Sequence, residues 1–516
     1  MLSTVQYLQF KSTTYLLIFN PVKFGKEIAL TIFVSLIYYA EIQMRSIVLV
    51  VLLLGFSVLA TGQINSGYKI SVAIDGLPDS TVYLAYHFGE MQYLKDTLKL
   101  DRSGQGVFSG AESLPQGIYM IVMPGRKYFE ILMSSDQAFS LTCNFPDYFK
   151  TLKFSGSDEN SAFVDYQRKW LAMQEEVAKV NARIEINKQN NDSLKILNEL
   201  RKDQEQKMIS YLNNVVESNK GSLLAMLVKA ILPIEVPVFQ IPPNVQNPDS
   251  VRWLKAYLYN KDHFFDNIDL TDERILRTPI LQSKLNIFFS NEVIQLADSI
   301  NKEIDKIIAK CSNNYKVFQF VAVFLFNHFR ESEIMGHDAV MVKLADDIYL
   351  SGKADWTTKE WRDNLKNEVD RIRPNLIGVK AHDLIMNTYT GVYKSIYDIK
   401  KDFTILYFWE PDCGHCQEAT PKLKAYYDKA KNEGVEVYAV CTKPDRDKWE
   451  AYIKDNNLDW INGWDPLRAT NFDYYYNVQS TPGIYILNKN KIIIAKKLSV
   501  EDIGPFIENY RKYNKN

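Results

Sequence analysis

The spacing of apolar residues changes along this chain, and each spacing restricts one segment to a different class of structure. In residues 68–154 apolar and polar residues alternate, and Ile70, Val72 and Ile74 occupy alternate positions. Clusters of turn-forming residues, such as DRSGQG at 101–106, separate the alternating runs. This pattern predicts an antiparallel β domain, in which every second side chain faces the core.

The middle of the chain has a helical spacing instead. From Asn160 onward apolar residues recur every three or four positions, which places them on one face of a helix, as follows: Phe163, Tyr166, Trp170, Met173, Val177 and Val180. A second helix is predicted from about Asp192 to Glu217, after the polar turn NKQNND, so the two helices should form an antiparallel hairpin. Helical patterns continue to about Arg373, and this region is predicted to be mostly α.

The last segment alternates strands and helices. TILYFW at 404–409 is a continuous apolar run, as expected for a strand that is buried on both faces. A helix, the second buried strand VEVYAVCT at 435–442, another helix, the strands GIYIL and KIIIAK, and a final helix follow. This order predicts an α/β domain, and 516 residues are enough for about three domains at ~100–200 residues each.

The stretch FWEPDCGHCQEATP contains the two cysteines that lie close together in sequence, Cys413 and Cys416. The chain has only 5 cysteines, which is too few for a disulfide scaffold. A zinc site would need two further ligands, and the sequence has no second C-x-x-C and no suitably spaced histidine pair. Because the pair directly follows a buried strand, a redox-active dithiol is favoured over a metal site or a chance pair.

Residues 44–63, MRSIVLVVLLLGFSVLATGQ, have the pattern of a secretory signal peptide. Arg45 provides the charged start, Ile47 to Leu59 the short apolar run, and small residues precede Gln63. We expect translation to begin at Met44; the alternative is a membrane hairpin or an uncleaved anchor that includes the apolar run at 28–40. Either way the body of the chain is predicted to lie in the periplasm or cell envelope.

These features together resemble the thioredoxin superfamily: a strand ending in Phe-Trp, the C-x-x-C, Pro421, and the late Thr481-Pro482 before a hairpin. With the signal peptide, they resemble its TlpA/ResA branch of envelope thiol–disulfide oxidoreductases. YLAYHFGE, GSDENSAFVDY and FDNIDLTDERILRTP also resemble Bacteroidota proteins in which a DUF4369-type β domain and a DUF5106-type helical domain precede the thioredoxin domain. The implied domains are the signal region 1–62, the β domain 63–157, the helical domain 158–373 and the thioredoxin-like domain 374–516.

The residues around the dithiol suggest a role for each group. Cys413 should lie at a helix N-terminus, where the free N–H groups and the helix dipole favour the attacking thiolate. Cys416, one turn later, would resolve the mixed disulfide, and His415 can carry positive charge beside the thiolate. Glu410 and Asp412 act in the opposite direction, because nearby carboxylates raise a thiol pKa.

The resemblance implies further site residues and one missing group. It implies a cis peptide bond between Thr481 and Pro482, with these two residues and Trp409 contacting the substrate. Tyr407 occupies the place of the buried acid of thioredoxin, and Ala419 the place of a glutamate in ResA-like members. The proton acceptor for Cys416 must then be a water molecule, Glu418 or a residue of another domain, or substrate release is slow.

Other titratable residues fit structural roles better than chemical ones. His263, Asp266, Asp269, Asp272, His337 and Asp338 could hold a metal, but no H-x-x-x-H or H-E-x-x-H spacing occurs, and LTDE has the form of a helix N-cap. We therefore expect helix caps and surface carboxylates, and no metal. Cys143, Cys311 and Cys441 are predicted to be small buried core residues.

The sequence therefore predicts an enzyme, a thiol:disulfide oxidoreductase that acts on protein disulfides as a reductase or an isomerase. No cofactor is expected beyond the Cys413–Cys416 disulfide, and the resemblance implies a membrane electron donor as partner. The 61 basic and 62 acidic residues nearly cancel, so nothing indicates a nucleic-acid partner. The alternative is an envelope binding or adaptor protein with a weakly active thioredoxin domain. The direction of electron flow, the clients and the oligomeric state are left open.

Overall fold

The structure is a computed structural model that describes residues 67–242 and 244–514. The predicted signal peptide and the expected start at Met44 lie outside the described residues. Within the described ranges, no helix combines the length and the apolar character needed to cross a bilayer.

The first region consists of two four-stranded sheets. One sheet has the strand order β4-β1-β7-β8 and the other β3-β2-β5-β6. Their bounds are β1 (Tyr68–Asp75), β2 (Thr81–Phe88), β3 (Met91–Lys99), β4 (Gln105–Gly110), β5 (Gly117–Met123), β6 (Lys127–Met133), β7 (Ala138–Asn144) and β8 (Lys153–Ser155). Neighbouring strands are antiparallel except β1 and β7, which pair in parallel. The predicted β region is thus observed, with one parallel pair that the alternating pattern could not indicate, because alternation does not record strand direction.

The predicted alternation forms the core of this region. Ile70, Val72 and Ile74 of β1 are all buried, and they pack with buried residues of the second sheet such as Ile121 and Ile131. Strand β3 is different, because most of its side chains are exposed. It is an edge strand, and Phe88, the last residue of the neighbouring β2, is exposed.

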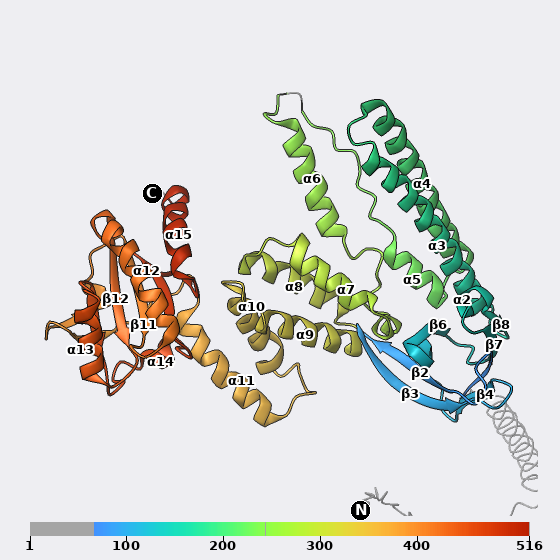
Figure 1. Cartoon of the computed structure of the whole chain (residues 1–516), viewed down its shortest axis with the longest axis horizontal. Helices are drawn as coiled ribbons and strands as arrows, with labels where there is room; N and C mark the ends of the chain where they lie inside the picture. Colours follow the sequence, from blue (N-terminus) through green and yellow to red (C-terminus); the bar gives the residue numbers. More distant parts are fainter. Residues whose placement is uncertain (1–66, 243, 515–516) are drawn as a thin grey trace, which may run out of the picture. The chain divides into compact units, whose positions relative to one another are not determined.

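The helical region begins with a long antiparallel hairpin (Figure 1), formed by α3 (Asp158–Ile186) and α4 (Asn191–Ser218). Each helix starts at a side-chain cap: Ser157 accepts a hydrogen bond from the N–H of Asn160, and Asn190 from the N–H of Ser193. The remaining helices are α5 (Leu223–Ile231), α6 (Pro248–His263), α7 (Ile280–Ile287), α8 (Ala297–Cys311), α9 (Tyr315–Arg330), α10 (His337–Leu344) and α11 (Lys359–Ile372), with short helical turns η2 (Glu273–Arg277), η3 (Phe288–Glu292), η4 (Ala345–Leu350) and η5 (Arg373–Asn375).

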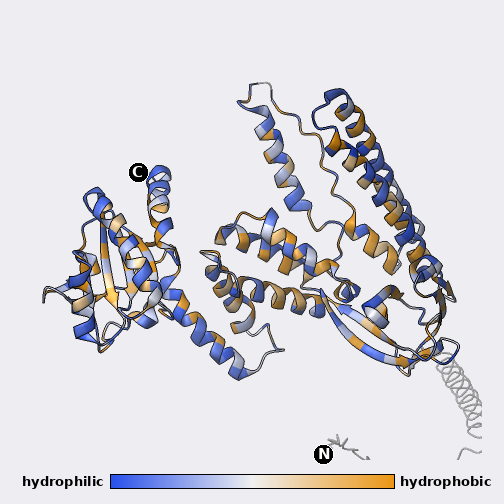
Figure 2. Cartoon of the chain, viewed as in Figure 1, coloured by the Kyte–Doolittle hydropathy of each residue, from blue (hydrophilic) through white to orange (hydrophobic). Residues whose placement is uncertain are grey.

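The apolar faces of α7 to α11 form a continuous core of their own. It includes the fully buried Leu281 and Leu285 of α7, Ile300 of α8, and Val321 and Leu325 of α9. Figure 2 shows α5, whose sequence is LLAMLVKAI, as a mainly hydrophobic helix. Because hydrophobic burial is the main favourable contribution to folding, this core holds the middle region together.

The C-terminal region is an α/β domain with a seven-stranded sheet of order β10-β9-β13-β12-β11-β14-β15. Its strands are β9 (Ile385–Thr388), β10 (Tyr393–Ser395), β11 (Phe403–Trp409), β12 (Val435–Cys441), β13 (Ile461–Trp464), β14 (Gly483–Asn488) and β15 (Ile493–Lys496). Its helices are α12 (Gly414–Ala430), α13 (Arg446–Asp455), α14 (Phe472–Tyr475) and α15 (Val500–Tyr513), with turns η6 (Ile396–Asp398) and η7 (Lys431–Glu433).

Strand β11 is buried at every position because cores lie on both faces of the sheet. Helices α12, α13 and α15 cover one face, with Leu423 of α12 and Ile503 of α15 among the buried residues. Phe472 of α14 and Tyr476 lie in the core of the other face. The fold class predicted from sequence is confirmed: β sheets, a helical middle region and a C-terminal α/β domain. The short strands β9, β10 and β13 were missed, because three or four residues are too few to establish a period.

Candidate active site

The end of β11 and the start of α12 position the two neighbouring cysteines. β11 ends at Trp409, a short turn follows, and Cys413 is the N-cap residue of α12. Cys413 is partly exposed, whereas Cys416 is fully buried one turn into the helix. Both are free thiols, so the structure is that of the dithiol form.

Cys413 lies against the loop that precedes β14. Its Sγ donates a hydrogen bond to the carbonyl oxygen of Thr481 over 3.4 Å. Burial raises the pKa of Cys413, but hydrogen bonds to the thiolate, from the Thr481 side chain and from the N–H groups of Cys416 and His415, outweigh burial. The pKa of Cys413 is therefore lowered, as expected for a thiolate at a helix N-terminus.

Cys416 has the opposite electrostatic environment. Burial, with a smaller contribution from the neighbouring Cys413, raises its pKa to about 12. At neutral pH the outer thiol therefore ionises far more readily than the inner one. Since only the thiolate reacts with a disulfide, Cys413 is the better nucleophile of the two, and Cys416 must lose its proton before it can react.

The charged or ionisable residues next to the two cysteines have contacts that their residue types alone do not indicate. The His415 side chain is exposed, and the contact that lowers the pKa of Cys413 comes from its backbone N–H. The two carboxylates beside the site are paired: Asp412 with Lys448 at 2.7 Å and Glu410 with Lys443 at 3.5 Å. Sequence reasoning missed both lysines, which follow β12 and lie far from the C-x-x-C along the chain.

Glu410 has a second contact that the sequence did not indicate. Its carboxylate accepts a hydrogen bond from the Thr442 hydroxyl at 2.8 Å. Because opposite charge and hydrogen bonding both compensate a carboxylate, the two acids oppose the Cys413 thiolate less than expected from sequence.

A group of hydroxyls lies in the core near Cys416. The Tyr407 hydroxyl is 2.8 Å from that of Thr420, and both residues are fully buried. Burial raises the pKa of Tyr407 and of Tyr452, and the charge of Cys416 raises both further, which places these hydroxyls in the electrostatic environment of the inner thiol. Thr420 was missed from sequence, although its position four residues after Cys416 places it one helical turn away on the same face.

None of the positions considered from sequence for an acid near Cys416 carries a buried carboxylate. Glu418 is exposed on α12, and Ala419 packs at the margin of the core. Position 407, which carries an acid in thioredoxin according to the resemblance, here carries a hydroxyl that is part of a hydrogen-bonded pair.

The predicted substrate-contact residues divide into two groups. Thr481 and Pro482 are half-buried and joined by a cis peptide bond, and they lie beside Cys413. Trp409 is fully buried and packs on Tyr452, with ring centroids 5.0 Å apart. Its burial does not fit the predicted contact with substrate, because β11 is covered on both faces and this ring belongs to the core.

The residues considered for a metal have structural contacts. His263 is 2.5 Å from Asp266, Asp269 bonds the Thr271 N–H, and Asp272 caps η2 by accepting from the Arg274 N–H. Within residues 67–242 and 244–514 no three His, Cys, Asp or Glu side chains form a group that could hold a metal ion.

The remaining residues considered from sequence as metal ligands or reactive thiols are buried or lie away from the dithiol. His337 is buried, with its ring 2.8 Å from the Ser332 hydroxyl. Asp338 pairs with Lys496 of β15. Three further cysteines are buried, as expected for core residues: Cys143, Cys311 and Cys441. Burial raises the pKa of Cys441 to about 11, so it is a poor nucleophile.

Comparison with known proteins assigns the class of this region. Residues 377–496 match the model of the AhpC/TSA family. This region is a thioredoxin-like domain, and it is homologous to thiol-disulfide oxidoreductases.

Two such relatives are proteins named thiol-disulfide oxidoreductase ResA. That of Bacillus cereus is 23% identical over 120 residues, which is 23% of this chain and 68% of the relative. That of Geobacillus kaustophilus is 25% identical over 141 residues, which is 26% of this chain and 78% of the relative.

Solved structures are also similar to parts of the chain. A domain of a possible thiol-disulfide isomerase from Cytophaga hutchinsonii is 38% identical; the match covers 27% of this chain and 96% of that domain, with a TM-score of 0.26. A thioredoxin-like protein from Bacteroides caccae is 20% identical; the match covers 54% of this chain and 99% of that protein, with a TM-score of 0.41.

Proposed function

We propose that this chain is an extracytoplasmic thiol-disulfide oxidoreductase that reduces or isomerises protein disulfides through Cys413 and Cys416. The observation that carries the proposal is the unequal pair of thiols at the start of α12. Cys413 is accessible and has a lowered pKa, whereas Cys416 is buried with a pKa of about 12. An attacking thiol and a resolving thiol need this difference.

The proposed reaction has two exchange steps. The Cys413 thiolate attacks one sulfur of a client disulfide, forms a mixed disulfide and releases the other client sulfur as a thiolate. The Cys416 thiolate then attacks Cys413 Sγ, forms the Cys413–Cys416 disulfide and releases the second client thiolate. Two electrons pass to the client, and an external dithiol donor must return them; we propose a membrane electron donor for this step. In isomerisation a client thiolate attacks the mixed disulfide instead, with no net electron transfer.

The loop before β14 would orient the client. Thr481 lies beside Cys413, and in the proposed complex the backbone of Thr481, next to Pro482, pairs with an extended client segment. His415 is exposed on the same helix turn, where its imidazole would meet the client rather than the thiolate.

A secretory signal within residues 44–63 would place the chain in the periplasm or cell envelope, where disulfides persist. We further propose that residues 63–157 and 158–373 correspond to DUF4369- and DUF5106-type domains ahead of the thioredoxin-like domain 374–516. Cell fractionation, with mass determination of the mature N-terminus, tests this location. A cytoplasmic protein that retains Met44 and the apolar run would contradict it.

The function is tested by reduction of insulin disulfides with dithiothreitol as donor. We expect turnover by the wild type and none by Cys413→Ser, whereas Cys416→Ser should accumulate a mixed disulfide at Cys413. Cys441→Ser is the matched control, because this thiol is buried and has a raised pKa. Turnover that survives Cys413→Ser would reject the enzyme function and favour an adaptor protein. Reactivation of scrambled ribonuclease then separates isomerase from reductase.

A further inference from the structure

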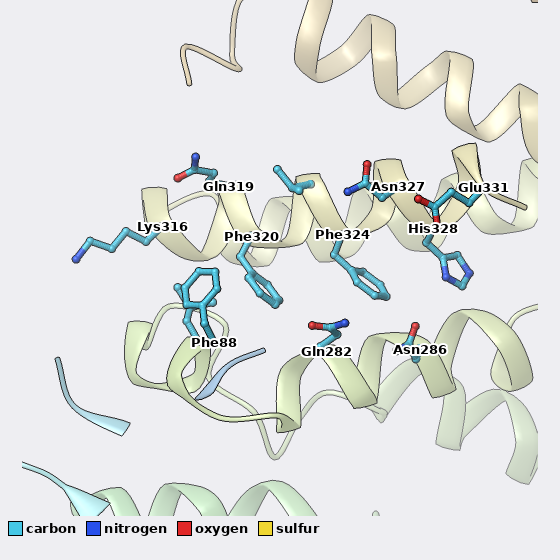
Figure 3. A pocket seen from close by; sticks show the side chains of 12 residues that line it. Phe88, Gln282, Asn286, Lys316, Gln319, Phe320, Phe324, Asn327, His328 and Glu331 are labelled. Atoms are coloured by element: carbon cyan, nitrogen blue, oxygen red, sulfur yellow. The ribbon is translucent and has the colours of Figure 1, made fainter. Parts of the chain in front are cut away.

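A groove in the helical region lies outside the redox site. It has a volume of about 870 Å³ and lies between α7 and α9, with the turn of the β2–β3 hairpin at one end. Figure 3 shows Phe320, Phe324 and His328 of α9 pointing toward Gln282 and Asn286 of α7. The aromatic and imidazole rings of α9 therefore form the floor of the groove, and the side-chain amides of α7 line one edge of it.

A second set of amides borders the row of rings on its other side. Gln319 and Asn327 lie there on α9, separated by two helical turns. In the part of the chain that the structure describes, the side chains of Asn286, Gln319 and Asn327 have no hydrogen-bond partner. Each primary amide offers two donors and an acceptor, which is the complement of a peptide main chain.

The spacing of these groups fits an extended chain. Residues four apart on a helix, such as Gln282 and Asn286, are separated by ~6 Å along its axis. Two residues of an extended peptide span ~6.6 Å, so Asn286 lies about one such step beyond Gln282, which already bonds the N–H of Glu90. Beyond the end that Phe88 occupies, the stretch of α9 from Phe324 to Glu331 is about 10 Å long, enough for about three extended residues.

The β2–β3 turn already uses one end of the groove in this way. The amide oxygen of Gln282 accepts a hydrogen bond from the backbone N–H of Glu90 at 3.1 Å, and the N–H of Gly89 bonds the carbonyl of Leu276 at 2.9 Å. The Phe88 ring packs edge-on against Phe320, with centroids 5.5 Å apart. This end of the groove thus holds a main-chain N–H and an aromatic side chain of the protein itself.

We propose that the free remainder of this groove binds an extended polypeptide segment with apolar side chains at alternate positions. The main chain would bond the amides of Asn286 and Asn327, and alternate side chains would pack on Phe324 and His328, as Phe88 packs on Phe320. A lipid chain fits less well, because it would cover these amides without bonding them. The inference does not depend on the redox function, since none of the groove residues belongs to the dithiol site.

The test measures fluorescence polarisation of a fluorescein-labelled peptide, Gly-Ser-Leu-Ser-Phe-Ser-Leu-Ser-Lys, with the full chain carrying Cys413→Ser and Cys416→Ser. These substitutions exclude covalent capture, so the result is independent of the proposed function. We expect saturable binding that weakens roughly tenfold or more in Asn286→Leu/Asn327→Leu, because two hydrogen bonds are lost. Asn313→Leu, an exposed asparagine outside the groove, is the matched control and should bind normally.

A second probe keeps the inference testable if the double variant does not fold. The same peptide with N-methyl groups at alternate residues keeps its side chains but loses the main-chain donors. We expect it to bind at least tenfold more weakly to the unaltered groove. Equal binding of the two peptides, equal binding by the double variant, or displacement of the peptide by maltoheptaose would overturn the inference, the last in favour of a carbohydrate.

Discussion

Replacing Tyr407 by phenylalanine removes one hydroxyl near the buried thiol and leaves the ring in place. The ring stacks on that of Trp409, with centroids 6.5 Å apart, and phenylalanine keeps this contact. The hydroxyl pairs with that of Thr420 at 2.8 Å in a fully buried position. We predict that this pair of hydroxyls stabilises the Cys416 thiolate as the mixed disulfide is resolved, while the proton passes to solvent.

The expected magnitude follows from the environment of Cys416. Its pKa of about 12 lies some three units above its ordinary value of 9.0, so its thiolate is about a thousandfold scarcer at neutral pH. Resolution of the mixed disulfide is therefore sensitive to any group that stabilises this thiolate. One hydrogen bond contributes about 0.5–1.5 kcal/mol, which corresponds to resolution about two- to tenfold slower in Tyr407→Phe.

Stopped-flow reaction with dithiobis(nitrobenzoate) measures the two steps separately. Attack by Cys413 releases the first thionitrobenzoate, and attack by Cys416 on the mixed disulfide releases the second. We expect the first phase to be unchanged and the second to be slower. Tyr438→Phe is the matched control, because it removes a buried hydroxyl that donates to the carbonyl of Lys394 at 2.9 Å, in the core on the other face of the sheet. A second phase at the wild-type rate, or equal slowing in the control, would refute the reasoning.

Four further predictions concern the Cys413 thiolate, the buried Lys496 and the packing of the helical core. Thr481→Val removes a hydrogen bond to the Cys413 thiolate, so its pKa should rise and the midpoint of iodoacetamide alkylation should move to higher pH; an unmoved midpoint would contradict this. Asp338→Ala leaves the buried Lys496 ammonium without its charge partner and should lower the free energy of unfolding, measured in urea, by about 3 kcal/mol. An unchanged free energy of unfolding would show that the pair is dispensable. Burial lowers the pKa of Lys496, so the folded chain binds fewer protons than the unfolded one and stability should rise as the pH approaches 10.5; a flat profile would argue against this. Phe289→Ala should lower the free energy of unfolding by about 3–5 kcal/mol in the same experiment, because the substitution leaves a cavity in the core. A much smaller decrease would indicate that the core collapses to fill this cavity.

The spacing of neighbouring residues was sufficient to predict which segments of this chain form strands and which form helices. Alternation predicts the strands of residues 68–154 because a pleated strand turns successive side chains to opposite faces. The apolar run of 404–409 predicts a strand covered on both sides, and this is β11. The position of Cys413 as a helix N-cap follows from the adjacent strand and helix signals alone. These are properties of neighbouring residues, and a sequence records them directly.

Only the tertiary structure decided which distant groups meet. Lys448 lies beside Asp412, although 36 residues separate them in sequence, and Thr420 meets Tyr407 because α12 packs on β11. Trp409 follows the strand pattern into the core, where its ring is fully buried. The amides that border the groove come from two helices whose sequences show no common motif. Such pairings depend on how packed elements approach one another, and the spacing of residues within a single element carries no information about that approach.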